Sequence, residues 1–150
     1  MIIDYLENNK SYINEVVKLL YNEFIDKNKI SYIEMERIIK SRCNINKIPL
    51  TIIAIIENEL AGFVSILEND LENNIELKPW LAGLFVKEHF RKQGIGKKLI
   101  EKVIKINYEL GNKNIYLKTE NSYEYYKKLN WSLIKKVKIN NLDSYVMEYK

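Results

Sequence analysis

The sequence contains little cysteine, histidine, proline or glycine. Its one cysteine, Cys43, cannot form an internal disulfide, and with no histidine near it in the sequence we expect a structural thiol, not a nucleophile. The one histidine, His89, lies among charged residues and is expected to be solvated. Two prolines, five glycines and the lack of a low-complexity tract argue against a disordered or fibrous chain.

A long hydrophobic run and a strong charge are also missing. The longest uncharged apolar run, at 48–56, is far shorter than the ~20 residues that a membrane-spanning helix needs. Residues 1–5 show no basic segment followed by an apolar stretch, so we expect no membrane association and a cytoplasmic location. The net charge of +4 is mild. The lysines at 127, 128, 135, 136 and 138 are expected on solvent faces of separate elements, so we expect no nucleic-acid partner.

The remaining composition is that of a globular protein. With 47% hydrophobic and 29% charged residues, a chain of 150 residues can bury a core, and it has the size of one ordinary domain. We therefore expect residues 1–150 to form a single domain. Eleven tyrosines supply large amphipathic side chains, which suit half-buried packing as well as a ligand cleft.

Hydrophobic periodicity predicts a three-layer α/β fold with the element order β-α-α-β-β-β-α-β-α-β-β. Apolar and β-branched runs predict strands at 2–6, 50–56, 60–67, 80–86, 115–119, 133–139 and 145–149. Apolar spacings of three and four predict helices at 13–24, 31–43, 94–110 and 122–129. A capping box of Ser31 and Glu34 marks the start of the second helix. The strand at 80–86 is almost entirely apolar and is expected to be buried on both faces.

A glycine-containing segment, Arg-Lys-Gln-Gly-Ile-Gly at 91–96, lies between that strand and an amphipathic helix. Gly94 and Gly96 let the backbone turn tightly and approach a ligand closely. The first N–H groups of the helix have no carbonyl partner, and with the positive end of the helix dipole they form an anion site. Cationic side chains surround it at Arg91, Lys92, Lys97 and Lys98. A pyrophosphate is thus a better ligand than a lone carboxylate. We call residues 91–97 the glycine cradle.

On these residues the sequence resembles the GNAT-type N-acetyltransferases. The family motif Arg/Gln-x-x-Gly-x-Gly/Ala is matched by Arg91-x-x-Gly94-x-Gly96. The segment Tyr126-Lys127-Lys128-Leu129-Asn130-Trp131 is similar to a second family segment, Tyr-Glu-Lys-Leu-Gly-Phe. Both matches lie at the family's separation and in its element order, so the resemblance covers essentially the whole chain. It implies a mixed, mostly antiparallel sheet of about seven strands flanked by about four helices.

The resemblance also implies an activity: transfer of the acetyl group of acetyl-CoA to a primary amine of a small molecule or peptide, by direct attack in a ternary complex. Backbone groups of the strand would pair with the pantetheine amides and polarise the thioester carbonyl at Leu84, Phe85 and Val86. N–H groups would hold the pyrophosphate at Gln93, Gly94, Ile95, Gly96 and Lys97, with help from Arg91 or Lys92. Tyr126 would protonate the leaving thiolate, because a tyrosine, with a reference pKa of about 10, keeps its proton at pH 7.

The sequence departs from the family pattern at other positions. Thr119 stands where many members carry an asparagine that contacts the cofactor, and Asn121 is nearby. Trp80 stands where several members carry a glutamate as general base, which leaves Glu76 as a candidate base acting through water. Trp80 and Tyr32 are expected to line the acceptor site, and no metal is expected.

No motif specifies the acceptor. Its pocket is expected at 24–32, 69–80 and 141–145, where acidic residues would suit a cationic amine: Glu68, Asp70, Glu72 and Glu76. The missing glutamate and Thr119 leave one alternative open, a non-catalytic acyl-CoA-binding or regulatory module that keeps the cofactor cleft. The protein is expected to be a monomer or a homodimer.

Overall fold

The computed structural model describes residues 1–23, 29–74 and 76–150. Its strands are β1 (Ile2–Tyr5), β2 (Leu50–Ile56), β3 (Glu59–Leu67), β4 (Trp80–Val86), β5 (Ile115–Thr119), β6 (Ser132–Ile139) and β7 (Leu142–Tyr149). Its α-helices are α1 (Ile13–Glu23), α2 (Tyr32–Ser41), α3 (Ile95–Glu109) and α4 (Tyr123–Lys128), with single 3₁₀ turns at Leu6–Asn8, Lys10–Tyr12 and Glu88–Phe90. Phe24, which the first predicted helix included, and part of the expected acceptor segment 24–32 lie outside the described residues.

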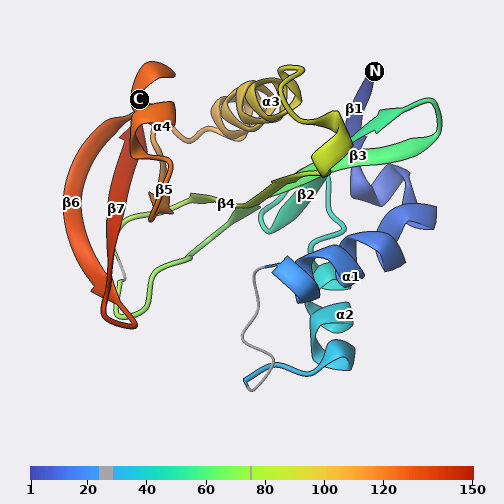
Figure 1. Cartoon of the computed structure of the whole chain (residues 1–150), viewed down its shortest axis with the longest axis horizontal. Coiled ribbons are helices and arrows are strands. Elements are labelled where there is room, and N and C mark those ends of the chain that lie inside the picture. Colours follow the sequence, from blue (N-terminus) through green and yellow to red (C-terminus); the bar gives the residue numbers. More distant parts are fainter. Residues whose placement is uncertain (24–28, 75) are drawn as a thin grey trace.

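The strands form one mixed sheet in the order β1-β2-β3-β4-β5-β7-β6. Neighbouring strands are antiparallel except β4 and β5, which are parallel. Helices α1 and α2 cover one face of the sheet and α3 covers the other (Figure 1). The predicted element order and three-layer α/β arrangement are confirmed.

Alternation along β2 supplies both layers of the core. Ile53 and Ile55 pack in the cluster that contains the buried side chains of α1 and α2, whereas Ile52 and Ala54 pack in the cluster with α3. This follows from the two-residue period of a strand, which sends successive side chains to opposite faces. A nearly continuous apolar strand therefore needs a helix layer on each side.

Local turn and cap chemistry sets several boundaries. The connections of β2 to β3 and of β6 to β7 are two residues long, at Glu57-Asn58 and Asn140-Asn141, and all four residues have positive φ. Such φ values are those of the tight turns that match the twist of a hairpin. Ser31 caps α2 as predicted, because its Oγ accepts a hydrogen bond from the Glu34 N–H at 3.1 Å. Among the helices in the described ranges, none is long and apolar enough to cross a membrane.

Strands β4 and β5 separate soon after they meet. Their only matched pair in the described residues is Trp80 with Tyr116, while the opposite edge of β4 pairs with β3 as far as Val86. A bulge at Gly83, with φ of +65°, further redirects β4. Residues 83–86 are consequently only half-buried. The prediction that 80–86 is buried on both faces was right for the first half of the strand and wrong for the second, which has β3 on one side and no strand on the side of β5.

Candidate functional site

The diverging strands enclose a cavity of about 600 Å³, which we call the strand cleft. Residues 81–84 of β4 line one side and residues 117–122 the other, with Tyr126 from α4 and Ser144 from β7. A second cavity of about 660 Å³, the cradle cavity, is lined by residues 84–86, much of the glycine cradle and Tyr125. Glu23 and Leu84 line both cavities, so the cradle cavity and the strand cleft adjoin, and we call the two together the channel.

The glycine cradle presents backbone donors to open space. Helix α3 begins at Ile95, and the first N–H to bond back along the chain is that of Lys98, to the Gly94 carbonyl at 3.1 Å. The N–H groups of 95–97 therefore have no acceptor inside the helix. Gly94 has φ of +80°, and a Cβ added there would meet no atom within 4 Å. A Cβ on Gly96 would come no closer than 3.6 Å to the Tyr125 hydroxyl. The cradle thus has the donors and the room that a pyrophosphate requires.

Arg91 links the end of β4 to the cradle. Its Nε donates to the Val86 carbonyl at 2.8 Å, and its guanidinium carbon lies 5.8 Å from the centre of the Phe85 ring. These two contacts fix the guanidinium against the strand end, beside the cradle cavity that Arg91 and Lys92 both line. The residues predicted to hold the pyrophosphate line this cavity except Gln93, whose Nε2 donates to the His89 carbonyl at 3.3 Å. Their roles stay predictions.

Tyr126 projects from α4 into the strand cleft. Its ring packs edge-on against Trp131, with centroids 5.8 Å apart, and 8% of the residue is exposed. Burial raises the pKa of Tyr126 above its ordinary value of 10.0, and the neighbouring Tyr125 adds to this rise. Within the described part of the chain its hydroxyl has no hydrogen-bond partner. The hydroxyl therefore keeps its proton at physiological pH and can donate it to a group in the cleft.

Thr119 and Asn121 both line the strand cleft beside Tyr126. The Thr119 Oγ1 accepts a hydrogen bond from the Ser122 N–H at 3.0 Å, at the residue that precedes α4. This bond uses one acceptor position of the hydroxyl and leaves its proton available for donation. A contact from Thr119 or Asn121 to a ligand in the cleft remains a prediction.

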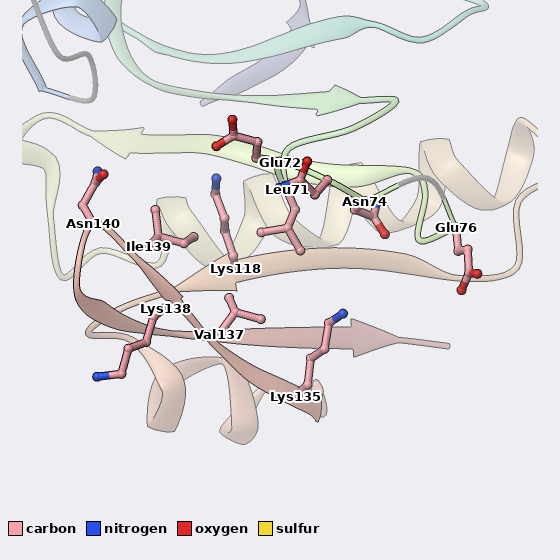
Figure 2. A pocket seen from close by; sticks show the side chains of 11 residues that line it. Leu71, Glu72, Asn74, Glu76, Lys118, Lys135, Val137, Lys138, Ile139 and Asn140 are labelled. Carbon is pink, nitrogen blue, oxygen red and sulfur yellow. The ribbon is translucent and has the colours of Figure 1, made fainter.

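Three residues predicted for catalysis or acceptor binding lie elsewhere. Trp80 is fully buried, and its Nε1 donates to the Leu77 carbonyl at 2.7 Å, so the prediction that it forms a wall of the acceptor site was wrong. Its position in the core follows from the pairing with β5 at that residue. Tyr32 packs against Tyr21 and lines neither cavity of the channel. Glu76 lines a separate groove and not the strand cleft (Figure 2).

The two reactive side chains expected to be structural or solvated also lie outside the channel. Cys43 is half-buried, its Sγ lies 3.6 Å from the Ile39 carbonyl, and burial raises the pKa of its thiol. A raised pKa disfavours the nucleophilic thiolate. The His89 side chain is 61% exposed and its Nε2 lies 3.0 Å from a carboxylate oxygen of Glu59.

Sequence reasoning singled out neither Asp70 nor Ser144, which both line the strand cleft. Asp70 appeared only as one of several acidic residues, and its loop position gave no periodicity that could mark it as half-buried. Burial raises the pKa of Asp70, against the opposing effect of Lys118, whose Nζ lies 3.9 Å from Asp70 Oδ2, and of Arg42. Ser144 is 2% exposed and comes from the last hairpin.

Known proteins share this architecture. The model of the acetyltransferase (GNAT) family matches residues 14–131. An aminoglycoside 6'-N-acetyltransferase solved with coenzyme A superposes with a TM-score of 0.79 at 20% identity, covering 99% of this chain and 96% of that one. A putative acetyltransferase from Salmonella typhimurium with acetyl-CoA gives 0.74 at 13% identity, covering 100% and 93%. A GNAT-family acetyltransferase from Staphylococcus aureus Mu50 gives 0.68 at 26% identity, covering 98% of each chain. The matched residues include the glycine cradle and Tyr126, and the chain belongs to the GNAT acetyltransferase family.

Proposed function

We propose that the chain transfers the acetyl group of acetyl-CoA to a primary amine of a small molecule or peptide, by direct attack in a ternary complex. The observation that carries the proposal is that the cradle cavity, with its free N–H groups, adjoins the strand cleft, with Tyr126 in its wall. Coenzyme A and acetyl-CoA are present in two of the similar structures, which makes them the natural donor to propose here.

The donor would lie along the channel. The free N–H groups at the start of α3 hold the pyrophosphate, and Lys92 and Lys97 border it with positive charge. Beyond the cradle, the edge of β4 that β5 leaves unpaired offers backbone groups at 84–86 to the pantetheine amides. This pairing resembles the addition of a strand to a sheet edge, and it directs the thioester into the strand cleft.

Two groups of the chain would stabilise the transfer. Acetyl-CoA supplies a thioester whose carbonyl carbon an amine can attack. A backbone N–H near Phe85 or Val86 donates to the carbonyl oxygen, on which negative charge grows during the attack. Tyr126, which burial keeps protonated, donates its proton to the leaving thiolate sulfur.

The acceptor would be a cationic amine. Three carboxylates line the strand cleft among the described residues: Glu23, Asp70 and Glu120. These three carboxylates outnumber the one cationic side chain of the described lining, Lys118, so they attract an ammonium group toward the thioester. One similar structure is an aminoglycoside N-acetyltransferase at 20% identity, so aminoglycosides belong in any panel of acceptors.

A thiol-release assay tests the proposal. Coenzyme A release is measured with acetyl-CoA and a panel of aminoglycosides, linear polyamines and peptides with free N-termini, and acetyl-CoA binding is measured in parallel by calorimetry. We expect a Kd for acetyl-CoA below about 1 mM. We also expect coenzyme A release above the hydrolysis background with at least one class of amine. Binding without release would favour the non-catalytic module, and the lack of binding at about 1 mM would contradict both.

A further inference from the structure

Asp70 is the carboxylate of the strand cleft that solvent reaches least. Of the three carboxylates that line the cleft in the described residues, Glu23 and Glu120 are exposed, whereas the Asp70 side chain is 29% exposed. The proposed function, on which this inference rests, needs a group that removes a proton from the acceptor, because a protonated amine has no lone pair for the attack.

Asp70 lies where two cavities meet. Beside the strand cleft is a groove of about 510 Å³ between residues 71–74 and 76 and the hairpin of β6 and β7, which we call the hairpin groove. Lys118 and Ile139 line both the strand cleft and the hairpin groove, and Leu71, the next residue after Asp70, lines the groove. Figure 2 shows Leu71 and Lys118 directed into this groove, with Glu76 at its far end. An amine that enters through the hairpin groove would therefore meet Asp70 on passing the shared wall into the strand cleft.

The surroundings of Asp70 suit a proton acceptor. Burial raises its pKa, while Lys118 on β5 and Arg42 behind it act in the opposite direction. Neither cation forms a tight ion pair: Lys118 Nζ is 3.9 Å away, and the Arg42 Nη1 donates to Ser65 Oγ at 3.4 Å. Glu23, Glu120 and Tyr126 face the same cleft from α1, from the end of β5 and from α4. A carboxylate more basic than an ordinary aspartate accepts a proton more readily.

We propose that Asp70 is the general base of the acetyl transfer and that the acceptor amine reaches it through the hairpin groove. The ammonium proton passes to the Asp70 carboxylate as the amine nitrogen bonds to the carbonyl carbon. The C–S bond then breaks, the thiolate takes the proton of Tyr126, and the second proton of the amine nitrogen leaves to restore the tyrosine. Asp70 releases its own proton to water in the groove, so each turnover yields the amide, the free thiol of coenzyme A and one proton.

The test compares Asp70→Asn with Glu109→Gln, which removes an exposed carboxylate on α3 that lines neither the strand cleft nor the hairpin groove. The probe is the amine of the panel that releases coenzyme A fastest. At pH 7 we expect kcat/KM to fall by roughly 10²–10⁴-fold for Asp70→Asn and to stay unchanged for Glu109→Gln. The difference in kcat/KM between Asp70→Asn and the wild type should shrink as the pH approaches the pKa of a primary amine, about 10.4, because the unprotonated amine then needs no base.

A second variant adds a readout in the free protein. Carboxyl carbon NMR of the unliganded protein should give Asp70 a pKa above its ordinary value of 3.8. Lys118→Met should raise that pKa further and move the acid limb of kcat/KM to higher pH, because the variant removes a cation that favours the carboxylate.

The outcomes separate the inference from the proposed function. If the wild type is active and Asp70→Asn matches it at pH 7, the inference fails and the function stands. A loss that is equal at every pH would likewise overturn the role as base, since it would indicate a role in binding or folding. If the wild type releases no coenzyme A with any amine, the function fails and the inference fails with it.

Discussion

Single residues in the strand cleft owe their chemistry to their surroundings. Burial raises the pKa of both Tyr126 and Asp70. A phenol with a raised pKa keeps its proton at physiological pH, whereas a carboxylate with a raised pKa binds a proton more tightly than usual. The same physical cause thus prepares one side chain as an acid and the other as a base, on two walls of one cavity.

Replacing Tyr126 by phenylalanine removes the hydroxyl and keeps the ring that packs on Trp131. We expect kcat to fall by about 10²–10⁴-fold, the typical contribution of a general acid, with the Kd for acetyl-CoA nearly unchanged. Steady-state kinetics and calorimetry measure the two quantities. Tyr108→Phe, at a side chain that is 76% exposed on α3, is the matched control and should leave both unchanged. Unaltered turnover in Tyr126→Phe would remove Tyr126 from the acid role.

Gly94 and Gly111 form a matched pair at the two ends of α3. Both have positive φ, +80° and +91°, and a Cβ at either would meet nothing within 4 Å. Alanine at each should cost about 1–2 kcal/mol of stability through backbone strain. Only Gly94→Ala places a methyl group in the cradle cavity, so only this variant should weaken acetyl-CoA binding. Thermal unfolding and calorimetry test this, and equal loss of affinity in both variants would contradict the cradle.

At the scale of elements, local sequence patterns predict where strands and helices begin and end better than they predict which of their residues are buried. The bounds of β2 and β5 follow from β-branched runs between turn residues, and the start of α2 follows from Ser31. The burial of 83–86 was predicted wrongly, because an apolar run of residues can form a strand inside the core or the wall of a cleft, and the sequence pattern is the same in both cases. Asp70 was expected near the acceptor only as one of four acidic residues, because the burial that distinguishes it depends on contacts with elements far away in the sequence.

The cap of α2 can be tested without touching the channel. Ser31→Ala removes the oxygen that accepts from the Glu34 N–H, and we expect a loss of about 1 kcal/mol in the free energy of unfolding. Ser31→Asp restores an acceptor and should recover most of that loss. Urea titration followed by circular dichroism measures both variants. Equal stability of Ser31→Ala and the wild type would show that the cap contributes nothing.

At the scale of the molecule, the sheet is nearly split between β4 and β5, yet one core spans the split. A single cluster combines Leu81 and Ile52 from one part of the sheet with Leu117 and Met147 from the other. Helix α3 contributes Leu99 to the same cluster. The opening between the strands therefore does not divide the core into independent halves, which supports our proposal that residues 1–150 form a single domain.

This shared core predicts a single cooperative unfolding transition. Trp80 reports on β4, where it is fully buried, and Trp131 reports on the region of α4 and β6. Tryptophan fluorescence of the single variants Trp80→Phe and Trp131→Phe, each with one remaining tryptophan, should coincide with circular dichroism across a urea titration. Circular dichroism of the wild type shows whether either substitution alters the transition itself. Fluorescence and dichroism transitions with different midpoints, or two steps in the wild-type dichroism curve, would indicate two independently unfolding units.

The channel itself is tested by amide-resolved NMR of the wild type during titration with acetyl-CoA. We predict the largest chemical-shift changes at the N–H groups of 93–97 in the cradle and of 84–86 in β4, with small changes at β1 and at Gly111. The groups at 95–97 start without an acceptor inside α3, so a bound pyrophosphate must alter them strongly. Saturating shifts confined to other parts of the chain, or no shifts at about 1 mM acetyl-CoA, would contradict the proposed donor site.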